Sequence, residues 1–192
     1  MSNIIITEKD KNESFDDIKE LLTLSHKNNI DEGILMNSQT LDSDEIKEKI
    51  GKDGVCFIAK EKDKLIGTNS IRFIEKNSWY AKGKTPNDIF AAIHPDYQGK
   101  HINTMLMNKA FNYLKEKNYS LVTLDTAANN KKAIQIYKHQ GFKLVKYTKY
   151  KDSNHYSVIM VKWFDICPYS NIYCKYQYYK SKIRTIRKNR GR

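Results

Sequence analysis

The sequence predicts an α+β protein with a single mixed, mostly antiparallel twisted sheet flanked by helices, followed by a basic C-terminal tail. Two observations predict this class. Short β-rich runs alternate with amphipathic helical patterns, and neighbouring runs are joined by polar hairpin loops. The length of 192 residues is enough for one domain with an ordinary core. We therefore expect one domain over residues 1–163 and a basic, aromatic extension over residues 164–192.

The N-terminal quarter is predicted to hold one strand and two helices. Residues 3–7 form a short apolar run that is typical of a strand. Ser14 is expected to cap a helix whose apolar positions recur at helical spacing. A second, shorter helix is expected to begin at Asp42 or Ser43 and to be closed by Gly51.

The next part of the chain is predicted to form three strands. Residues 55–60 and 65–74 are two β-rich runs separated by a polar hairpin loop. A loop that contains Gly83 and Pro86 is expected to lead to a further strand over residues 89–93.

A helix–strand–helix arrangement is predicted after these strands. A helix is expected over residues 102–117, followed by a buried strand over residues 121–124. Asn129 or Asn130 is expected to open the next helix, which ends before Gly141.

The chain is predicted to end with two strands and an amphipathic helix. Residues 143–150 and 156–161 have the composition of strands. Residues 166–192 hold 8 Lys and Arg and no acidic residue, and Pro168 suits a first helical turn. An apolar stripe on this helix is expected to pack against protein; a second subunit, an anionic membrane or RNA are the alternatives. The stripe comprises Tyr169, Ile172, Tyr176, Tyr179, Ile183 and Ile186.

Composition and charge exclude several classes of protein. Hydrophobic residues make up 40% and charged residues 29%, which excludes disordered and collagen-like chains. No window approaches the roughly 18 consecutive apolar residues of a membrane span, and the N-terminal residues turn acidic too early for a secretory signal. Cys56, Cys167 and Cys174 lack metal-ligand spacing, so we expect free thiols, no metal and a cytoplasmic location.

The formal net charge of +12 is unevenly distributed along the chain. Residues 1–50 hold 12 Asp and Glu against 6 Lys, whereas residues 51–165 hold 20 Lys and Arg against 10 acids. A basic middle segment suits a polyanionic ligand, although surplus Lys that merely maintains solubility is an equally simple interpretation.

Two segments carry the chemistry. In the first, residues 93–103, a strand runs through a tight loop into a helix, with Lys100 beside the turn. Backbone N–H groups and a helix dipole then converge on one point, which suits a pyrophosphate. In the second, Asn130 and Ala133 are followed by Tyr137 and by a Gly-Phe pair at residues 141–142.

This pattern resembles the GCN5-related N-acetyltransferase (GNAT) family, over roughly residues 1–163. The resemblance implies a GNAT-type acyl-CoA N-acyltransferase fold. It also implies transfer of an acetyl group from acetyl-CoA to a primary amine, by direct attack in a ternary complex. Gln98 and Gly99 match the family's pyrophosphate motif, whereas His101 and Asn103 stand where the family usually has glycine. Because His and Asn adopt positive φ more readily than most residues, we expect the loop to keep its shape.

The resemblance also implies how the cofactor is held. The pantetheine arm is expected along residues 91–93, with the N–H of Ile93 polarising the thioester carbonyl. Asn130 is expected to hydrogen-bond the pantetheine or its neighbouring loop, unless it is a plain helix N-cap. The implied cofactor-binding residues are Ala91, Ile93, Gln98, Gly99, Lys100, His101, Ile102, Asn103, Thr104, Asn130, Ala133 and Tyr137.

The proton transfers need an acid and a base. The resemblance makes Tyr137 the general acid that protonates the departing CoA thiolate; a core aromatic residue is the alternative. At the position where the family often has a basic Glu, this chain has Asn87, which cannot accept a proton. Asp88 is the nearest carboxylate and our candidate base, with Glu75 and a water chain as other candidates.

In this family the first two helices and their connection usually wall the acceptor site. The acidic cluster there would attract a cationic amine, although a solvated helix surface explains it as well. The cluster comprises Asp31, Glu32, Asp42, Asp44 and Glu45.

Three further alternatives stay open. A degenerate family member could bind nucleic acid or a membrane surface through residues 166–192. Ala91 and Ala92 could leave space for an acyl group other than acetyl. The chain could also form a homodimer.

Overall fold

A computed structural model describes residues 3–11, 14–27, 34, 40–151 and 153–190. A seven-stranded mixed sheet runs through it in the order β1-β2-β3-β4-β5-β7-β6. Only the pairing between β4 and β5 is parallel, which confirms the predicted mixed, mostly antiparallel sheet. The strands are β1 (Ile4–Glu8), β2 (Val55–Glu61), β3 (Lys64–Ser78), β4 (Ala81–Ile93), β5 (Leu121–Ala127), β6 (Lys143–Lys149) and β7 (Tyr156–Trp163).

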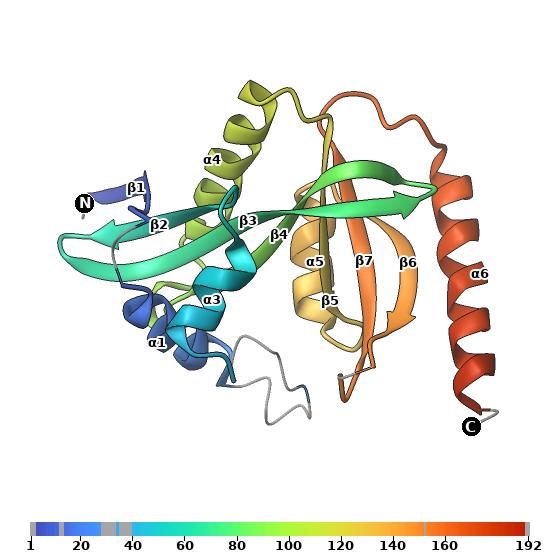
Figure 1. Cartoon of the computed structure of the whole chain (residues 1–192), viewed down its shortest axis with the longest axis horizontal. Helices are drawn as coiled ribbons and strands as arrows, with labels where there is room; N and C mark the ends of the chain where they lie inside the picture. The colour runs from blue at the N-terminus through green and yellow to red at the C-terminus, as the bar shows by residue number, and fades with distance from the viewer. Residues whose placement is uncertain (1–2, 12–13, 28–33, 35–39, 152, 191–192) are drawn as a thin grey trace.

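Helices cover both faces of this sheet and one of its edges (Figure 1). The main core lies between the sheet and α4, and Tyr137 of α5 packs against it. A second core lies under α1 and α3 on the opposite face. The α6 helix stands beside β6 at the end of the sheet. The helices are α1 (Asp16–Ser25), α3 (Ser43–Ile50), α4 (Ile102–Glu116), α5 (Lys131–His139) and α6 (Asn171–Arg190), with a 3₁₀ turn, η2, at Pro95–Tyr97.

The two N-terminal helices begin close to where the sequence predicts. The expected Ser14 cap of α1 is wrong by one residue, because Phe15 is the N-cap and no side chain caps this helix; the Ser14 hydroxyl accepts the N–H of Asp16 at 3.1 Å. Asp42 caps α3 in a reciprocal capping box with Glu45, and Gly51 closes this helix with a φ of 79°.

The expected loop around Gly83 and Pro86 is wrong. The β3–β4 hairpin continues to the pair Ser78↔Ala81, so Gly83 and Pro86 lie within β4. Proline is tolerated because the register with β5 begins only at Asn87, leaving Pro86 in a part of β4 with one strand neighbour. Long-range pairing therefore overrides the local turn signal.

At its C-terminal end β4 separates from β5. The register joins Asn87 to Thr123 and Asp88 to Leu124, and beyond these two pairs the strands diverge. A β-bulge lies at the same place: Phe90 has a φ of 55°, and the pairing of β4 with β3 shifts there. We call this divergence the splay.

The predicted packing of the tail helix is wrong in its choice of face. The stripe residues Ile172, Tyr176 and Tyr179 are 81%, 55% and 57% exposed. The opposite face docks instead. The Ser181 hydroxyl accepts the N–H of Tyr147 at 2.8 Å, and the Thr185 hydroxyl donates to the carbonyl of Tyr147. Small and hydroxylated side chains let α6 approach the edge of β6 and satisfy its backbone.

The α6 helix also begins later than expected, so Pro168 precedes it. All three cysteines are free, as expected. Within the described ranges, no helix is both long and apolar enough to cross a membrane.

Candidate active site

The loop from β4 to α4 forms a cradle of unpaired backbone N–H groups. The first hydrogen bond within α4 runs from the N–H of Met105 to the carbonyl of His101 at 3.1 Å. The three preceding N–H groups, of residues 102–104, therefore have no partner within the helix. No side chain caps this helix, and its first turn holds no acid. The cradle is thus open to an anion.

The two residues that replace glycine in this loop behave differently. His101 has a φ of 60° at the N-cap of α4, which confirms that this residue takes the left-handed conformation. Asn103 lies inside the helix, where its amide contacts Met107 Sδ at 3.7 Å. Gly99 also has a positive φ, of 79°, and a Cβ placed there would meet no atom within 4 Å. The loop therefore keeps its turn without the usual glycines.

The side chains just before the cradle contact neighbouring residues. The Lys100 ammonium lies 4.5 Å from the centroid of the Tyr97 ring, and the Tyr97 hydroxyl donates to Glu61 at 2.6 Å. The Gln98 amide donates to the carbonyl of Ile93 at 3.4 Å. Lys100 is thereby held beside the exposed turn of the cradle.

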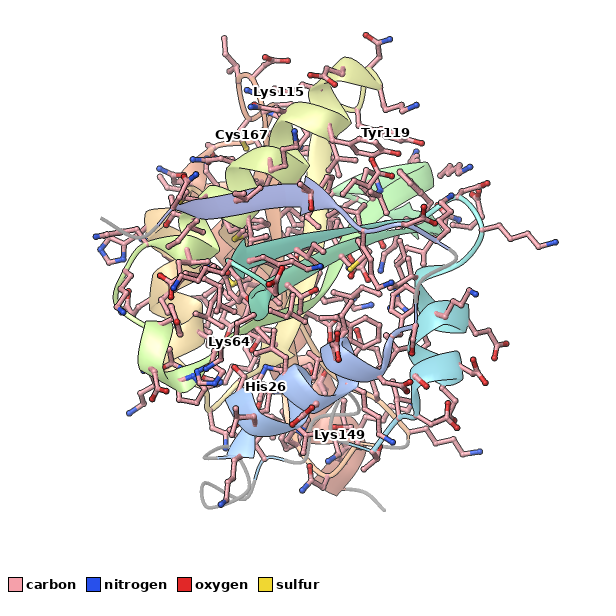
Figure 2. All side chains as sticks on the ribbon, turned by 90° about the vertical axis from the view of Figure 1, so that its left-hand side faces the viewer. His26, Lys64, Lys115, Tyr119, Lys149 and Cys167 are labelled. Atoms are coloured by element: carbon pink, nitrogen blue, oxygen red, sulfur yellow. The ribbon has the colours of Figure 1, made fainter. Side chains whose placement is uncertain are left out.

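The backbone of β4 presents donors to the splay. The N–H of His94 bonds the carbonyl of Ile66 in β3 at 2.9 Å. Because successive strand residues direct their backbone groups to opposite sides, the N–H of Ile93 points away from β3. The end of α1 closes over this segment: Ser25 donates to the Ile93 carbonyl at 3.0 Å, and His26 hydrogen-bonds the Ala91 backbone. In Figure 2 His26 and Lys149 lie toward one end of the molecule, opposite Lys115 and Tyr119.

Asn130, Ala133 and Tyr137 lie at the start and along the length of α5, and Tyr137 packs against the core that α4 covers. Asn130 is the N-cap, and its side-chain oxygen accepts the N–H of Ala133 at 3.0 Å, which confirms the plain capping role. The ring of Tyr137 packs edge-on against Phe142 at 5.8 Å between centroids. Burial, and then the charges of Asp88 and Asp125, raise the pKa of Tyr137 above its usual range. The phenol therefore stays protonated at neutral pH.

Asp88 lies on the same face of the sheet as Tyr137. Its register partner Ile71 belongs to the core beneath α4, and directly paired residues share a face. The carboxyl accepts a hydrogen bond from the amide of Asn69 at 3.0 Å and is only 4% exposed. Burial raises the pKa of Asp88 to about 7, partly offset by the Asn69 hydrogen bond. Its role as base stays a prediction.

A different set of polar residues faces α1 and α3. Asn87 accepts a hydrogen bond from Arg72 Nε at 3.0 Å and donates to the Thr123 carbonyl at 3.2 Å. Asp125 of β5 lies on the same face of the sheet, because its register partner Ile159 belongs to the small core on the side away from α4. Sequence reasoning missed Asp125, although its position two residues after Thr123 in a strand was a usable signal.

The remaining expectations fall in three groups. In the acidic cluster, Asp42 and Glu45 are engaged in the α3 capping box, and Asp44 is exposed beside them. Asp31 and Glu32 lie outside the described residues. Glu75 is exposed on β3. In the part of the chain that the structure describes, no cluster of His, Cys, Asp and Glu could hold a metal ion.

Comparison with known proteins decides the family. The family model described as the Acetyltransferase (GNAT) family matches residues 16–142, from the start of α1 to the end of the Tyr137 motif. The chain belongs to the GNAT family. The match spans both the cradle and α5, so the two segments that suggested the resemblance lie within one recognised GNAT domain.

Individual relatives agree with this GNAT assignment. An uncharacterised N-acetyltransferase of Methanocaldococcus jannaschii is 42% identical over 50 residues, a match that spans 26% of this chain and 22% of that relative. The ribosomal-protein-S18-alanine N-acetyltransferase of Escherichia coli is 14% identical with a TM-score of 0.64, over 85% of this chain and 96% of that one.

Two solved GNAT structures hold the cofactor. The PaiA N-acetyltransferase of Thermoplasma acidophilum, in complex with coenzyme A, is 19% identical with a TM-score of 0.65, covering 84% of this chain and 99% of that one. YncA of Salmonella typhimurium, with acetyl-CoA, is 17% identical with a TM-score of 0.60, covering 88% and 98%. These likenesses show that this chain has the GNAT fold.

Proposed function

We propose that this protein transfers an acetyl group from acetyl-CoA to a primary amine, by direct attack of the amine in a ternary complex. The observation that supports the proposal is the splay between β4 and β5, which lies just before the open cradle at the start of α4. Tyr137 of α5 packs against the core on the same face, and burial and then the charge of Asp88 beside the splay raise the pKa of Tyr137. Neighbours of the same fold are named as acetyltransferases and hold CoA or acetyl-CoA.

The residues present fit acetyl-CoA. The uncapped N–H groups of residues 102–104 suit its pyrophosphate, with Lys100 adding positive charge. A groove of about 610 Å³ between α4 and α5, lined in part by Thr104, Asn108 and His139, suits the adenosine portion. The Asn130 oxygen is engaged in capping, so its amide N–H group is the part that remains for the pantetheine arm.

Each site residue then has a distinct task. Acetyl-CoA supplies an acyl group activated as a thioester. The N–H of Ile93 donates a hydrogen bond to the acyl oxygen, where negative charge develops. Tyr137 holds the proton that the CoA sulfur receives, and its raised pKa keeps that proton in place until it is needed. Two carboxyls flank the splay as candidate bases, Asp88 on the Tyr137 face and Asp125 on the opposite face.

The test measures release of CoA thiol from acetyl-CoA in the presence of small primary amines. Wild-type protein is expected to show saturable turnover. Tyr137→Phe is expected to lower kcat about a hundredfold while its affinity for acetyl-CoA is unchanged, because only proton donation is lost. Tyr119→Phe is the matched control, since this tyrosine packs on Phe73 and lies toward the opposite end of the molecule from His26. Equal activity of the two variants would contradict the role of Tyr137.

A second candidate function rests on α6. Its exposed face carries Ile172, Tyr176 and Tyr179 beside basic side chains, and such a surface suits RNA or an anionic membrane. Binding of single-stranded RNA would then weaken steeply with salt and with Tyr176→Ala in the full chain. The cytoplasmic location, the homodimer and a larger acyl group beside Ala91 and Ala92 stay predictions.

A further inference from the structure

Asp125 lies at the base of the splay, on the face of the sheet that looks toward α1 and α3. Leu124, the residue before it, is the last position of β5 that pairs with β4. Asp125 is therefore the first residue of β5 beyond the paired region. Leu124 points into the core beneath α4, so Asp125 points to the other face, as its partner Ile159 does.

Two cationic side chains from β3 share this face with Asp125. Arg72 uses its Nε to donate to Asn87, and its two terminal nitrogens make no hydrogen bond or ion pair with the described residues. Lys76 lies four residues further along β3 and therefore on the same face, and its charge interacts with those of Asp125, Arg72 and Lys146. The charges of Asp125, Arg72 and Lys76 therefore act on one another.

These charges are not joined into ion pairs. Within the described residues, no salt bridge or hydrogen bond engages the carboxylate of Asp125. If the three groups had only a structural role, the carboxylate would be expected to form an ion pair with one of the two cationic side chains, because a partly buried charge without a partner is costly. Unpaired groups of both signs on one face of the sheet instead suit a ligand that carries both signs of charge.

Desolvation acts on both members of the cluster. Burial raises the pKa of Asp125, and the charges of Arg72, Lys76 and His155 oppose this effect. Burial also lowers the pKa of Lys76. The charge of Asp125 raises this pKa, and the charges of Lys146 and Arg72 lower it further. Ligand charges would be poorly screened in this environment, so complementary groups would bind strongly.

Tyrosines and a histidine complete the surroundings of the cluster. Tyr80 follows β3, and Tyr150 and His155 come from the connection between β6 and β7; the charge of Asp125 acts on all three. The charge of Asp125 also acts on Tyr137, which lies across the sheet at the splay. The cluster is thus near the position assigned to the thioester.

We propose that Asp125, Arg72 and Lys76 form the acceptor subsite for an amine that also carries an anionic group. Asp125 binds the ammonium, and Arg72 and Lys76 bind the anionic group. This inference rests on the proposed function. It replaces attraction of a purely cationic amine by the acids of α3, because Asp42 and Glu45 of that set are engaged in a capping box.

The proton balance assigns Asp125 a direct part in the reaction. Its carboxylate takes one proton from the ammonium, which frees the nitrogen lone pair. The new bond joins this nitrogen to the acyl carbon, and the bond between the acyl carbon and sulfur breaks. The nitrogen loses a second proton to solvent, and the sulfur gains one from Tyr137. Asp125 then releases its proton to solvent, and Tyr137 takes one back from solvent. The net products are the N-acetylated acceptor, CoA thiol and one proton released to solvent.

The test compares matched acceptors in the full-length protein by thiol release. Glycine, β-alanine, γ-aminobutyrate and leucine are each compared with the amine that lacks the carboxylate: methylamine, ethylamine, propylamine and isoamylamine. Phosphoethanolamine against ethanolamine distinguishes a phosphate from a carboxylate. At least one acceptor that carries an anionic group is expected to exceed its matched amine in kcat/KM by about tenfold to a hundredfold, the value of one charged hydrogen bond.

Variants connect this preference to the named residues. Lys76→Gln and Arg72→Gln are expected to shrink the preference about tenfold, mainly through KM of the acceptor that carries the anionic group. Lys82→Gln, an exposed lysine of the β3–β4 hairpin, is the charge-matched control. Asp125→Asn is expected to lower kcat about a hundredfold, with acetyl-CoA affinity retained, whereas Asp88→Asn has a smaller effect.

Three results would overturn the proposal. They are equal or better turnover of the amines that lack the anionic group, no turnover of any acceptor that carries it by a protein that binds acetyl-CoA, and retained activity of Asp125→Asn alongside inactive Asp88→Asn. Failure of acetyl-CoA to bind, measured by titration, would instead reject the proposed function itself. The two failures are therefore distinguishable.

Discussion

Side chains around the splay divide between the two faces of the sheet according to their position in the strands. Asp88 and Tyr137 lie on the face of α4 and α5, whereas Asn87 and Asp125 lie on the face of α1 and α3. The sequence singled out Tyr137 as a candidate site residue and predicted the positive φ of His101, because each lies in a motif of contiguous residues. Strand alternation could have placed Asp125 on the same face as Thr123, but not beside the splay, because that depends on where β4 and β5 separate.

Asp88 is predicted to make stability depend on pH. Its pKa is raised from 3.8 to about 7 in the folded state, so the folded protein retains a proton that the unfolded chain has lost. The corresponding stability is fully present below the unfolded pKa and is lost as pH rises through about 7. Asp88→Asn should therefore be more stable than wild type near pH 8, by up to about 4 kcal/mol, and the difference should shrink toward pH 4.

Chemical denaturation across this pH range measures the effect. Asp63→Asn, at an exposed turn between β2 and β3, serves as the control and should show no such trend. A constant difference between Asp88→Asn and wild type at every pH would contradict the assigned pKa shift.

At the scale of elements, local signals predicted where helices begin but not which face of a helix is buried. The α6 helix has apolar side chains around more than one face, so periodicity alone selected the stripe that the structure exposes. The β3–β4 hairpin was likewise longer than its sequence suggested, since pairing across the sheet carries Gly83 and Pro86 into β4.

Adjacent tyrosines test the docking face of α6. Tyr178 packs edge-on against Tyr147 of β6 at 6.2 Å, whereas Tyr179 is 57% exposed. Tyr178→Ala should lower the free energy of unfolding by about 1–3 kcal/mol because it removes packed aromatic area. Tyr179→Ala should change it by less than about 0.5 kcal/mol, as is usual for a surface position. Denaturant unfolding that ranks the two variants in reverse would place the other face against β6.

Gly67 tests how β3 supports α4 and hence the cradle. A Cβ there would lie 2.9 Å from Ile93 Cδ1 and 3.0 Å from Leu106 Cδ1. Gly67→Ala should therefore cost about 1–3 kcal/mol of stability by overpacking and should weaken acetyl-CoA binding by shifting α4. Adding Ile93→Val removes the nearest methyl group and should restore part of the stability. An unchanged melting temperature in Gly67→Ala would show that α4 is not held at this point.

At the scale of the whole molecule, one sheet organises both the GNAT core and the tail. The order of helices and strands was predictable because each connection is local, and the family match covers residues 16–142. The boundary at residue 163 stays a prediction, yet α6 packs along the edge strand β6. The tail therefore contributes to the sheet's stability as well as carrying positive charge.

Removal of residues 164–192 should expose the edge of β6. The backbone of Tyr147 would lose its bonds to Ser181 and Thr185, and an uncovered edge strand invites pairing with another chain. The shortened protein should melt at lower temperature and should self-associate in sedimentation velocity. If it instead stays monomeric with an unchanged melting temperature, α6 is an independent appendage.

The central claim is that the cradle and the splay bind acetyl-CoA, and calorimetric titration of acetyl-CoA into the full-length protein tests it most directly. Binding in the micromolar range is expected, and His101→Asp should weaken it about tenfold or more, because a carboxylate at the start of α4 would compete for the open N–H groups. No binding up to millimolar acetyl-CoA in the wild-type protein would contradict the account.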